Sequence, residues 1–351
     1  MNKIKETVNQ ITTLDYKLME ATQIRLDNLT KPQGSLGRLE GLAKLIVGIT
    51  GKENPQVKNK VIFTLTADHG VTEEGISAYP KEVTAQMVYN FLSGGAGINV
   101  LARHIGARVV VVDAGVCSDL KPHPQLIIKK INYGTKNMAS GAAMTRDEAI
   151  KSIETGMELL EEEMSKGIDI VGTGDMGIGN TTPSSAITAC FTKKPVEDVT
   201  GKGTGIDDRA LKNKIRVIKQ ALKVNAPDLK NPIDVLAKVG GFEIGGLTGI
   251  ILAAASKRVP IVIDGFISGA AALIAYCLEP RVKDFMIASH CSQEIGHRII
   301  LDYIGLKPLL DLDLRLGEGT GAALGINIIE AAVKILTQMA TFKNAGVSEK
   351  N

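Results

Sequence analysis

Six short apolar runs are spaced along the chain, and each stops at a glycine or a polar residue. The runs are continuous rather than alternating, which is typical of strands buried on both faces of a parallel sheet. Helical patterns lie between them, so we expect an open, mostly parallel, doubly wound α/β sheet flanked by helices in three Rossmann-like layers. The predicted strands are 61–66, 108–112, 126–131, 168–171, 259–263 and 285–288, and the predicted helices are 81–92, 146–165, 207–224, 243–256, 266–277 and 321–341.

Ionisable side chains follow several of these strands. In an open α/β sheet, ligands bind beyond the carboxyl ends of the strands. Asp68, Asp113, Asp175, Asp264 and His290 all fall at such ends. We therefore expect the functional site at this edge of the sheet.

The segment 168–185, IDIVGTGDMGIGNTTPSS, combines an apolar run, a glycine-rich stretch and a helix that opens near Asn180. A strand, a glycine turn and a helix N-terminus present bare backbone N–H groups to an anion. The spacing is close to that of a P-loop, but Asn180 stands where the P-loop lysine is required. This disfavours a triphosphate and favours a smaller anion such as a monophosphate. Asp175 adds a carboxylate that a simple anion loop has no need of.

Glu318 lies in Gly317-Glu-Gly-Thr-Gly321, just before the last predicted helix. Glycines let the backbone approach a ligand closely, so a lone glutamate there can act as a general base. The alternative is that Glu318 only complements the dipole of that helix. The spacing by itself leaves both roles open, and a useful base needs burial to offset the effect of the dipole on its pKa.

Two further segments can be interpreted either as ligand-binding sites or as ordinary surface structure. The stretch 201–207, GKGTGID, precedes a helix that carries Lys212 and Lys214, which is a plausible phosphate site. A surface loop before a solvated basic face is the better reading of that segment alone. Tyr79 and Gln86 in 75–88 could face a planar heterocycle, or be an ordinary turn aromatic and a surface residue.

Composition narrows the class of protein. The chain has 351 residues, 44% hydrophobic and 23% charged, which is typical of a soluble α/β enzyme. A net charge of +3, no Trp and 4% aromatics do not indicate a nucleic-acid partner. The N-terminus has no signal-peptide core, and the longest nearly uncharged run, 265–278, is too short to span a bilayer.

The cysteines and histidines indicate neither a disulfide framework nor a metal. Cys117, Cys190, Cys277 and Cys291 form no CxxC pair, so a reducing cytoplasm is the expected location. His69, His290 and His297 lack the paired spacing of a zinc helix, and we predict no metal and no cofactor. Residues 3–50 have helical patterns broken at 29–35, where Ser35 is predicted to cap the second helix.

Taken together, eight segments in order resemble the nicotinate-nucleotide:dimethylbenzimidazole phosphoribosyltransferase family. The similarity runs essentially end to end, which makes it far more specific than any single glycine motif. The segments are LDNLTKPQGSLGRLE (26–40), TADHGV (66–71), GISAYPKEVTAQMV (75–88), FLSGGAGINVLAR (91–103), GDMGIGNTT (174–182), GKGTGID (201–207), SHCSQEIGH (289–297) and GEGTGAALG (317–325).

The resemblance implies transfer of ribose 5-phosphate from nicotinate mononucleotide to 5,6-dimethylbenzimidazole, as in cobalamin nucleotide-loop synthesis. It also implies a homodimer with the site at the carboxyl edge of the sheet. It further implies one small helical domain formed by both ends of the chain, with residues 1–58 as its N-terminal part. A large α/β domain spans 59–305, and 306–351 holds the glutamate loop and a helix that returns to the small domain.

The resemblance also assigns roles to residues. Glu318 would be the general base, and Asp175 a second catalytic carboxylate. Asp175 stands where familiar members carry glutamate, which withdraws the charge by about one methylene, on the order of an ångström. The phosphate or nucleotide contacts would be Gly177, Gly179, Asn180, Gly203, Thr204, Gly205, Lys214 and Ser292, and the benzimidazole contacts Tyr79, Gln86, Met176 and Leu316.

Three other functions compete with this one. A transferase using phosphoribosyl pyrophosphate is disfavoured because no apolar run leads to paired acids and Thr-Gly. A dinucleotide-dependent oxidoreductase lacks GxGxxG after the first strand with an acid about 20 residues on. A non-catalytic nucleotide sensor has no need of a buried base such as Glu318.

Overall fold

The sheet of the computed structural model, which describes residues 1–348, has six strands in the order β3-β2-β1-β4-β5-β6. Every neighbouring pair is parallel. The chain winds outward in both directions from the junction of β1 and β4, so the predicted doubly wound fold is confirmed. The strands are β1 (Lys60–Ala67), β2 (Ala107–Gly115), β3 (Leu126–Ile128), β4 (Ile170–Met176), β5 (Ile261–Ile263) and β6 (Met286–Ala288).

Strand β4 differs most from its prediction. It begins two residues late and continues to Met176, so Gly172 and Gly174 lie in the strand and not in a loop. The physical reason is close packing. A Cβ on Gly174 would lie 2.3 Å from the carbonyl oxygen of Glu318, so only glycine lets that segment pass.

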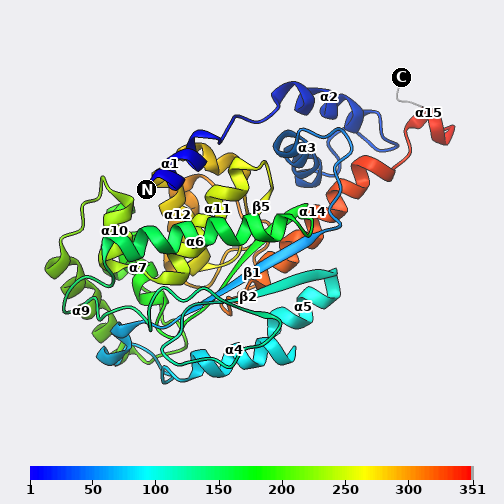
Figure 1. The fold of residues 1–351 in the computed structure, drawn as a ribbon. Helices are drawn as coiled ribbons and strands as arrows, with labels where there is room; N and C mark the ends of the chain where they lie inside the picture. Colours follow the sequence, from blue (N-terminus) through cyan, green and yellow to red (C-terminus); the bar gives the residue numbers. More distant parts are fainter. Residues whose placement is uncertain (349–351) are drawn as a thin grey trace.

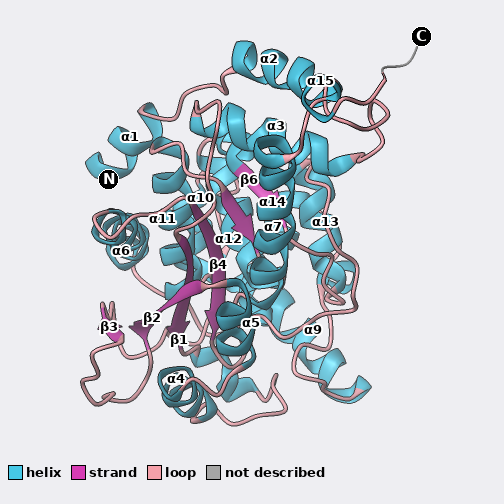
Figure 2. Cartoon of the chain, turned by 90° about the vertical axis from the view of Figure 1, so that its right-hand side faces the viewer, coloured by secondary structure: helices cyan, strands magenta, loops and turns pink. Residues whose placement is uncertain are grey.

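Helices cover both faces of the sheet, as Figure 2 shows. On one face α11 contacts β1, β2, β4 and β5, and α6 and α12 pack against α11. On the other face α14 contacts β1, β4 and β5, flanked by α3 and α5, while α4 contacts β1 and β2. The α-helices are α1 (Asn2–Asn9), α2 (Tyr16–Asp27), α3 (Arg38–Thr50), α4 (Val83–Ser93), α5 (Gly97–Ile105), α6 (Arg146–Met164), α7 (Thr181–Thr192), α8 (Val196–Val199), α9 (Asp208–Asn225), α10 (Pro232–Val239), α11 (Phe242–Ser256), α12 (Phe266–Leu278), α13 (Ile295–Ile304), α14 (Thr320–Gln338) and α15 (Phe342–Ala345).

The hydrophobic core divides along the same plane. Val61, Phe63 and Leu65 of β1 belong to the cluster under α11, whereas Ile62 belongs to the cluster under α14. Successive side chains of a strand point to opposite faces, and every residue of β1 is buried. This double burial explains why the strand sequences read as continuous apolar runs.

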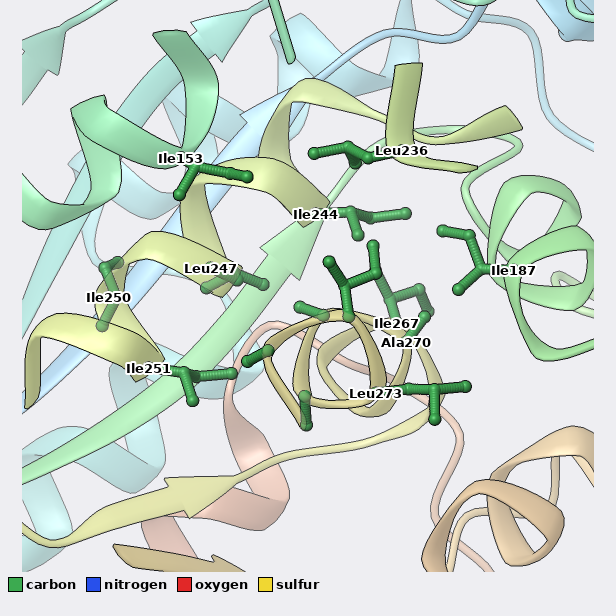
Figure 3. Packing of buried hydrophobic residues seen from close by; sticks show 14 of the residues in the cluster. Ile153, Ile187, Leu236, Ile244, Leu247, Ile250, Ile251, Ile267, Ala270 and Leu273 are labelled. Atoms are coloured by element: carbon green, nitrogen blue, oxygen red, sulfur yellow. The ribbon is translucent and has the colours of Figure 1, made fainter. Parts of the chain in front are cut away.

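Figure 3 shows the first cluster, where side chains from α6, α7, α10, α11 and α12 converge. Helices α6 and α11 approach closely because glycine lies at their crossing. A Cβ on Gly156 would lie 1.8 Å from the carbonyl oxygen of Gly246, and one on Gly249 would lie 1.9 Å from that of Ile153. This contact leaves no room for a side chain.

Helices α2 and α3 lie beside the end of α14 and α15 (Figure 1), whereas α1 packs on α6 and α11. Leu29 and Thr341 form an antiparallel bridge, and Thr30 N–H donates to the carbonyl of Ala340 at 3.0 Å. These contacts agree with the predicted small helical domain, which combines helices from the N-terminal and C-terminal parts of the chain. The domain boundaries at residues 58 and 305 stay predictions.

The start of α3 corrects the prediction for Ser35. The helix begins at Arg38 with Gly37 as its N-cap, so Ser35 lies before the helix and does not cap it. Instead, the Glu40 carboxylate accepts from Leu36 N–H at 3.0 Å and pairs with the buried Lys31 ammonium at 2.8 Å. A charged side chain from within the helix therefore organises this turn.

Among the described residues, one helix, α14, is long and apolar enough to cross a membrane by length and composition alone. Within the fold, 56% of that stretch is buried, and α14 packs on the sheet, α3 and α5. Its Glu330 pairs with Lys60 at 2.8 Å and with Lys334 at 2.7 Å. These contacts make α14 a core helix of this fold.

Candidate functional site

A cavity of about 460 Å³ opens where β4, β5 and β6 end, next to the point where the strand order reverses. This is where doubly wound sheets place their ligands. The lining residues come from six separate segments of the chain, within 76–87, 175–181, 203–204, 265–267, 290–294 and 315–318. The cavity thus lies at the carboxyl edge of the sheet, where the functional site is expected.

The turn from β4 into α7 presents its backbone to this cavity. Gly177, Gly179, Asn180 and Thr181 line it, and Gly179 has a left-handed φ of 89°. Asn180 is the N-cap residue of α7, yet its side chain donates to Asp175 at 2.9 Å instead of capping the helix. Thr182 and Ser184 donate to backbone carbonyls, whereas the N–H groups of Gly179 and Thr181 donate to no group within residues 1–348. These two N–H groups and the positive end of the helix dipole therefore suit an anion.

Asp175 is a buried carboxyl group at the end of β4, not in the loop. Its Oδ2 accepts from Asn180, and its Oδ1 has no partner among the described residues. Burial, together with the negative charges of Asp264, Glu243 and Glu318, raises the pKa of Asp175 well above its usual value. Asp175 therefore lines the cavity as a carboxyl group with a strong tendency to hold a proton.

The Glu318 loop has a conformation that side chains rarely adopt. Gly317, Glu318 and Gly319 have φ angles of 78°, 65° and 99°. The left-handed region costs a non-glycine residue about 1 kcal/mol or more, so the surrounding structure must impose it on Glu318. Thr64 Oγ1 donates to the carbonyl of Glu318 at 2.9 Å, and Glu318 N–H donates to that of Asp175 at 3.2 Å.

The Glu318 carboxylate faces the start of α5. Its Oε2 accepts from Ile98 N–H at 3.0 Å, in the first turn of that helix. Thus the dipole that Glu318 complements most directly is that of α5, although Glu318 precedes α14 in sequence. Burial raises the pKa of Glu318, and the Ile98 N–H opposes this rise. Glu318 lines the cavity, and its Oε1 accepts no hydrogen bond from residues 1–348.

Asp264, which follows β5, anchors the Glu318 loop through hydrogen bonds to the backbone. Its two oxygens accept from the N–H groups of Gly319 at 3.1 Å and Ala322 at 3.0 Å. Complete burial raises the pKa of Asp264 to about 7, against the effect of these backbone donors. Asp264 thus fixes where α14 begins and where Glu318 points.

Lys214, on α9, is buried and does not line the cavity, but it bonds to Thr181, which does. Its ammonium donates to Thr181 Oγ1 at 2.7 Å and to the carbonyl of Gly201 at 3.3 Å. Burial lowers the pKa of Lys214 to about 8, and the charge of Glu294 opposes this shift. A buried lysine beside the first residue of α7 is well placed to pair with an anion bound there.

The other residues predicted to contact the phosphate do not all reach the cavity. Gly203, Thr204 and Ser292 line the cavity, whereas Gly205 does not. The N–H of Gly203 already donates to the buried Glu294 carboxylate at 2.8 Å. Gly205 instead closes the turn, with a φ of 99° and an N–H bond to the Lys202 carbonyl, so the structure does not bring this predicted contact to the site.

An apolar part of the lining comes from Tyr79, Met87, Met176 and Leu316. Gln86, predicted as a heterocycle contact, is exposed and does not line the cavity. Consecutive helix residues are turned by about 100°, so the face of α4 that presents Met87 turns Gln86 away. From this part of α4, therefore, the thioether of Met87 and not the amide of Gln86 lines the cavity.

Comparison with known proteins agrees with this geometry. A sequence model of the family described as "Phosphoribosyltransferase" matches residues 11–347. Over 349 residues, 99% of each chain, the protein is 58% identical to the nicotinate-nucleotide–dimethylbenzimidazole phosphoribosyltransferase of Geobacter sulfurreducens. The chain belongs to this phosphoribosyltransferase family.

Other members are similar along nearly the whole chain. The enzyme of the same name from Desulforudis audaxviator is 59% identical over 99% of each chain. The crystal structure of the Thermus thermophilus phosphoribosyltransferase of that name is 42% identical, with a TM-score of 0.91 over 96% of this chain and 100% of that one. The phosphoribosyltransferase fold is therefore shared along nearly the whole chain.

The histidines of this phosphoribosyltransferase are engaged with neighbouring side chains and backbone. His69 Nε2 lies 2.7 Å from Glu243 in a fully buried pair, which raises its pKa despite burial. His297 Nδ1 accepts from Ser292 N–H at 3.0 Å, and burial lowers its pKa to about 3. No group of three or more His, Cys, Asp or Glu side chains within residues 1–348 is arranged to hold a metal ion.

Sequence reasoning missed several residues that the phosphoribosyltransferase fold brings to the cavity. Met87, Glu294 and Arg315 line it, although the sequence assigned them no role. Met87 and Glu294 lie inside the segments 75–88 and 289–297 quoted for the family resemblance, but nothing in those motifs singles them out as site residues. Asp264 and His290 were expected at this edge because both follow predicted strands, but without an individual role.

Proposed function

We propose that the protein transfers ribose 5-phosphate from nicotinate mononucleotide to 5,6-dimethylbenzimidazole, yielding α-ribazole 5′-phosphate and nicotinate for cobalamin nucleotide-loop synthesis. The bond from ribose C1′ to the pyridinium nitrogen breaks, and its electron pair returns to the nicotinate ring. A bond forms between C1′ and an azole nitrogen, and the azole N–H proton moves to a base. The leaving pyridine nitrogen becomes neutral and needs no proton.

Glu318 carries this proposal. Its carboxylate is buried, oriented by the Ile98 N–H through Oε2, and has Oε1 available to accept a proton at the cavity. Burial raises its pKa, which makes it a better base than an exposed glutamate. The left-handed backbone at Glu318 is strain of the kind that persists at functional positions.

The phosphate group is proposed to bind at the start of α7. The N–H groups of Gly179 and Thr181, the helix dipole and the nearby Lys214 ammonium together supply positive potential there. Anchoring the phosphate places ribose C1′ between the departing and attacking nitrogens, which lowers the entropic barrier. Gly203, Thr204 and Ser292 complete the proposed contacts.

The azole is proposed to lie against Tyr79, Met87, Met176 and Leu316. Tyr79 and Leu316 are 54% and 60% exposed, so a planar ring would cover apolar surface that is otherwise open to water. Attack from the face opposite nicotinate inverts C1′, giving an α-product from a β-nucleotide. A β-configured product in an NMR spectrum would contradict this geometry.

The first experiment follows nicotinate release from nicotinate mononucleotide by chromatography, with and without 5,6-dimethylbenzimidazole and without added metal. Release that depends on the base, together with a ribosylated product of the expected mass, supports the transferase. Nucleotide binding without release supports a sensor or a different acceptor base. A strict Mg²⁺ requirement with phosphoribosyl pyrophosphate as donor would favour the competing transferase.

A homodimer and a cytoplasmic location also belong to the proposal. The family resemblance supports the dimer, and the free state of Cys117, Cys190, Cys277 and Cys291 is compatible with a reducing compartment. Light scattering coupled to size exclusion gives the mass in solution. A mass of about twice the 37.3 kDa chain is the expected result, and a mass equal to one chain would contradict it.

A further inference from the structure

His290 is a buried histidine at the cavity that the proposed chemistry leaves without a role. It follows β6, is 2% exposed, and lies between the first residues of α12 and α14. A Cβ on Gly321 would lie 2.0 Å from Nδ1, and one on Gly265 would lie 3.6 Å from Cε1. The ring therefore needs glycine at position 321, three residues after Glu318, whereas Gly265 is only an ordinary neighbour of the ring.

The hydrogen bonds around His290 determine its tautomer. Ser289 Oγ donates its single proton to the carbonyl oxygen of Asp264 at 3.1 Å. The bond of 3.0 Å between Ser289 Oγ and His290 Nδ1 must then be donated by the ring. In the neutral ring Nε2 is consequently an acceptor.

The ring is neutral at physiological pH because burial lowers the pKa of His290 to about 4. Its Nε2 accepts no hydrogen bond from residues 1–348. Nε2 of His297 is fully buried, whereas Nε2 of His290 retains some accessibility at the cavity. His290 thus offers the cavity an uncharged acceptor, held in place by Ser289.

Few substrate groups can donate to such an atom. Above neutral pH the phosphate and the carboxylate of nicotinate mononucleotide only accept, and the pyridinium nitrogen carries no proton. The azole N–H of the second substrate is given to Glu318 in the proposed reaction. The ribose hydroxyls are the donors that remain.

We propose that His290 Nε2 accepts a hydrogen bond from a ribose hydroxyl of the nucleotide, and that His290 therefore selects ribonucleotides over deoxyribonucleotides. This inference rests on the proposed function. As positive charge develops at C1′, the hydroxyl becomes more acidic and the bond strengthens, as hydrogen bonds to the 2-hydroxyl do in glycoside hydrolysis. A deoxy substrate leaves Nε2 without a partner in a water-poor site.

The test compares nicotinate mononucleotide with its 2′-deoxy and 3′-deoxy analogues in the wild type, His290→Phe and His290→Gln. Phe keeps a ring but removes the acceptor, whereas Gln retains an oxygen near the position of Nε2. We expect the wild type to prefer the ribonucleotide over one deoxy analogue by about 10- to 100-fold in kcat/KM. That ratio falls toward one in H290F and is partly restored in H290Q.

A ratio that stays the same in H290F, or an equal loss for all three nucleotides, overturns the inference because it shows a purely structural role. Calorimetric dissociation constants for the same nucleotides give the discrimination without turnover, so the inference stays testable if the transfer reaction fails. Absence of base-dependent nicotinate release in the wild type contradicts the proposed function instead. Where H290F does not fold, the ribo-to-deoxy ratio of H290Q against the wild type decides.

Discussion

At the scale of single residues, Glu318 is subject to two opposing effects on one carboxyl group. Burial favours the protonated form, and the Ile98 N–H favours the ionised form. The net effect is a raised pKa, so Glu318 gains basicity while the helix start holds it in one orientation. This balance suits a group that must be ionised before reaction and protonated afterwards.

We predict that Glu318→Gln lowers kcat by about 10²- to 10⁴-fold and leaves nicotinate mononucleotide binding nearly unchanged. A base acts when ionised, and a raised pKa means that ionisation is lost at a higher pH than for an ordinary glutamate. The acid limb of the wild-type kcat profile is therefore expected above the ordinary value of 4.5, and E318Q lacks it. Turnover like that of the wild type in E318Q would remove Glu318 from the mechanism.

A second prediction at this scale concerns Lys214. With a pKa of about 8, its ammonium is charged below that pH and neutral above it, so phosphate capture weakens as pH rises. The kcat/KM for the nucleotide should fall above pH 8, and Lys214→Met should lower it about 10- to 100-fold at pH 7 and abolish this limb. Lys212→Met, at an exposed position two residues away, is the control and should change neither.

At the scale of elements, the site depends on how closely β4 and the Glu318 loop approach. Gly174 touches the loop backbone from the strand, and Asp264 holds the loop from the end of β5. The approach orients Glu318, the proposed base, through backbone contacts that leave no space for a side chain at residue 174. Misplacement of a reacting group by about 1 Å costs on the order of 10² in rate.

Gly174→Ala tests this contact. The added Cβ would meet the Glu318 carbonyl at 2.3 Å and push the loop outward, so kcat should fall by at least about 100-fold. Gly41→Ala is the matched control, because Gly41 lies inside α3 with no atom within 4 Å of its Cβ position. That change should leave turnover intact and stabilise the protein by up to about 1 kcal/mol in urea unfolding. Normal turnover in G174A would show that the contact does not orient the base.

At the scale of the whole molecule, the buried histidines make the free energy of unfolding depend on pH. The pKa values of His290 and His297 are lowered to about 4 and about 3, so the unfolded chain binds protons that the folded chain does not. Their effect is absent above pH 6.5, and the protein loses stability as pH falls below it. The raised pKa values of Asp264, Asp175 and Glu318 act in the opposite direction, for Asp264 between about pH 4 and 7.

His297→Gln isolates one of these contributions. Between pH 7 and pH 5 the wild type should lose about 2 kcal/mol of stability relative to H297Q, because a histidine with an unfolded pKa of about 6.5 must stay neutral when buried. Urea unfolding at both pH values measures this difference. His104→Gln, which replaces an exposed histidine of α5, is the control variant. Equal pH dependence of H297Q and the wild type would contradict the assigned burial effect.

The sequence by itself determined the layers of the fold and the edge where the site lies. Strands buried on both faces are apolar throughout, and the helices between them repeat their apolar residues every three to four positions. Both patterns can therefore be recognised within a short stretch of sequence. The polar ends at Asp175, Asp264 and His290 marked the carboxyl edge, and the eight ordered motifs identified the family. Glu318 stood out because glycines surround it on both sides.

Only the tertiary structure decided which residues meet. Gly174 was expected in a loop, yet it extends β4 because a segment 144 residues further along the chain, the Glu318 loop, packs on it. The carboxylate of Glu318 faces α5 rather than its own helix, and the cavity takes Met87 in place of Gln86. Ser289 donates to the carbonyl of Asp264, which lies 26 positions before His290 in sequence. This bond obliges the His290 ring to donate through Nδ1, and it leaves Nε2 as the acceptor. Such contacts join distant segments, and no local pattern records the distance between them.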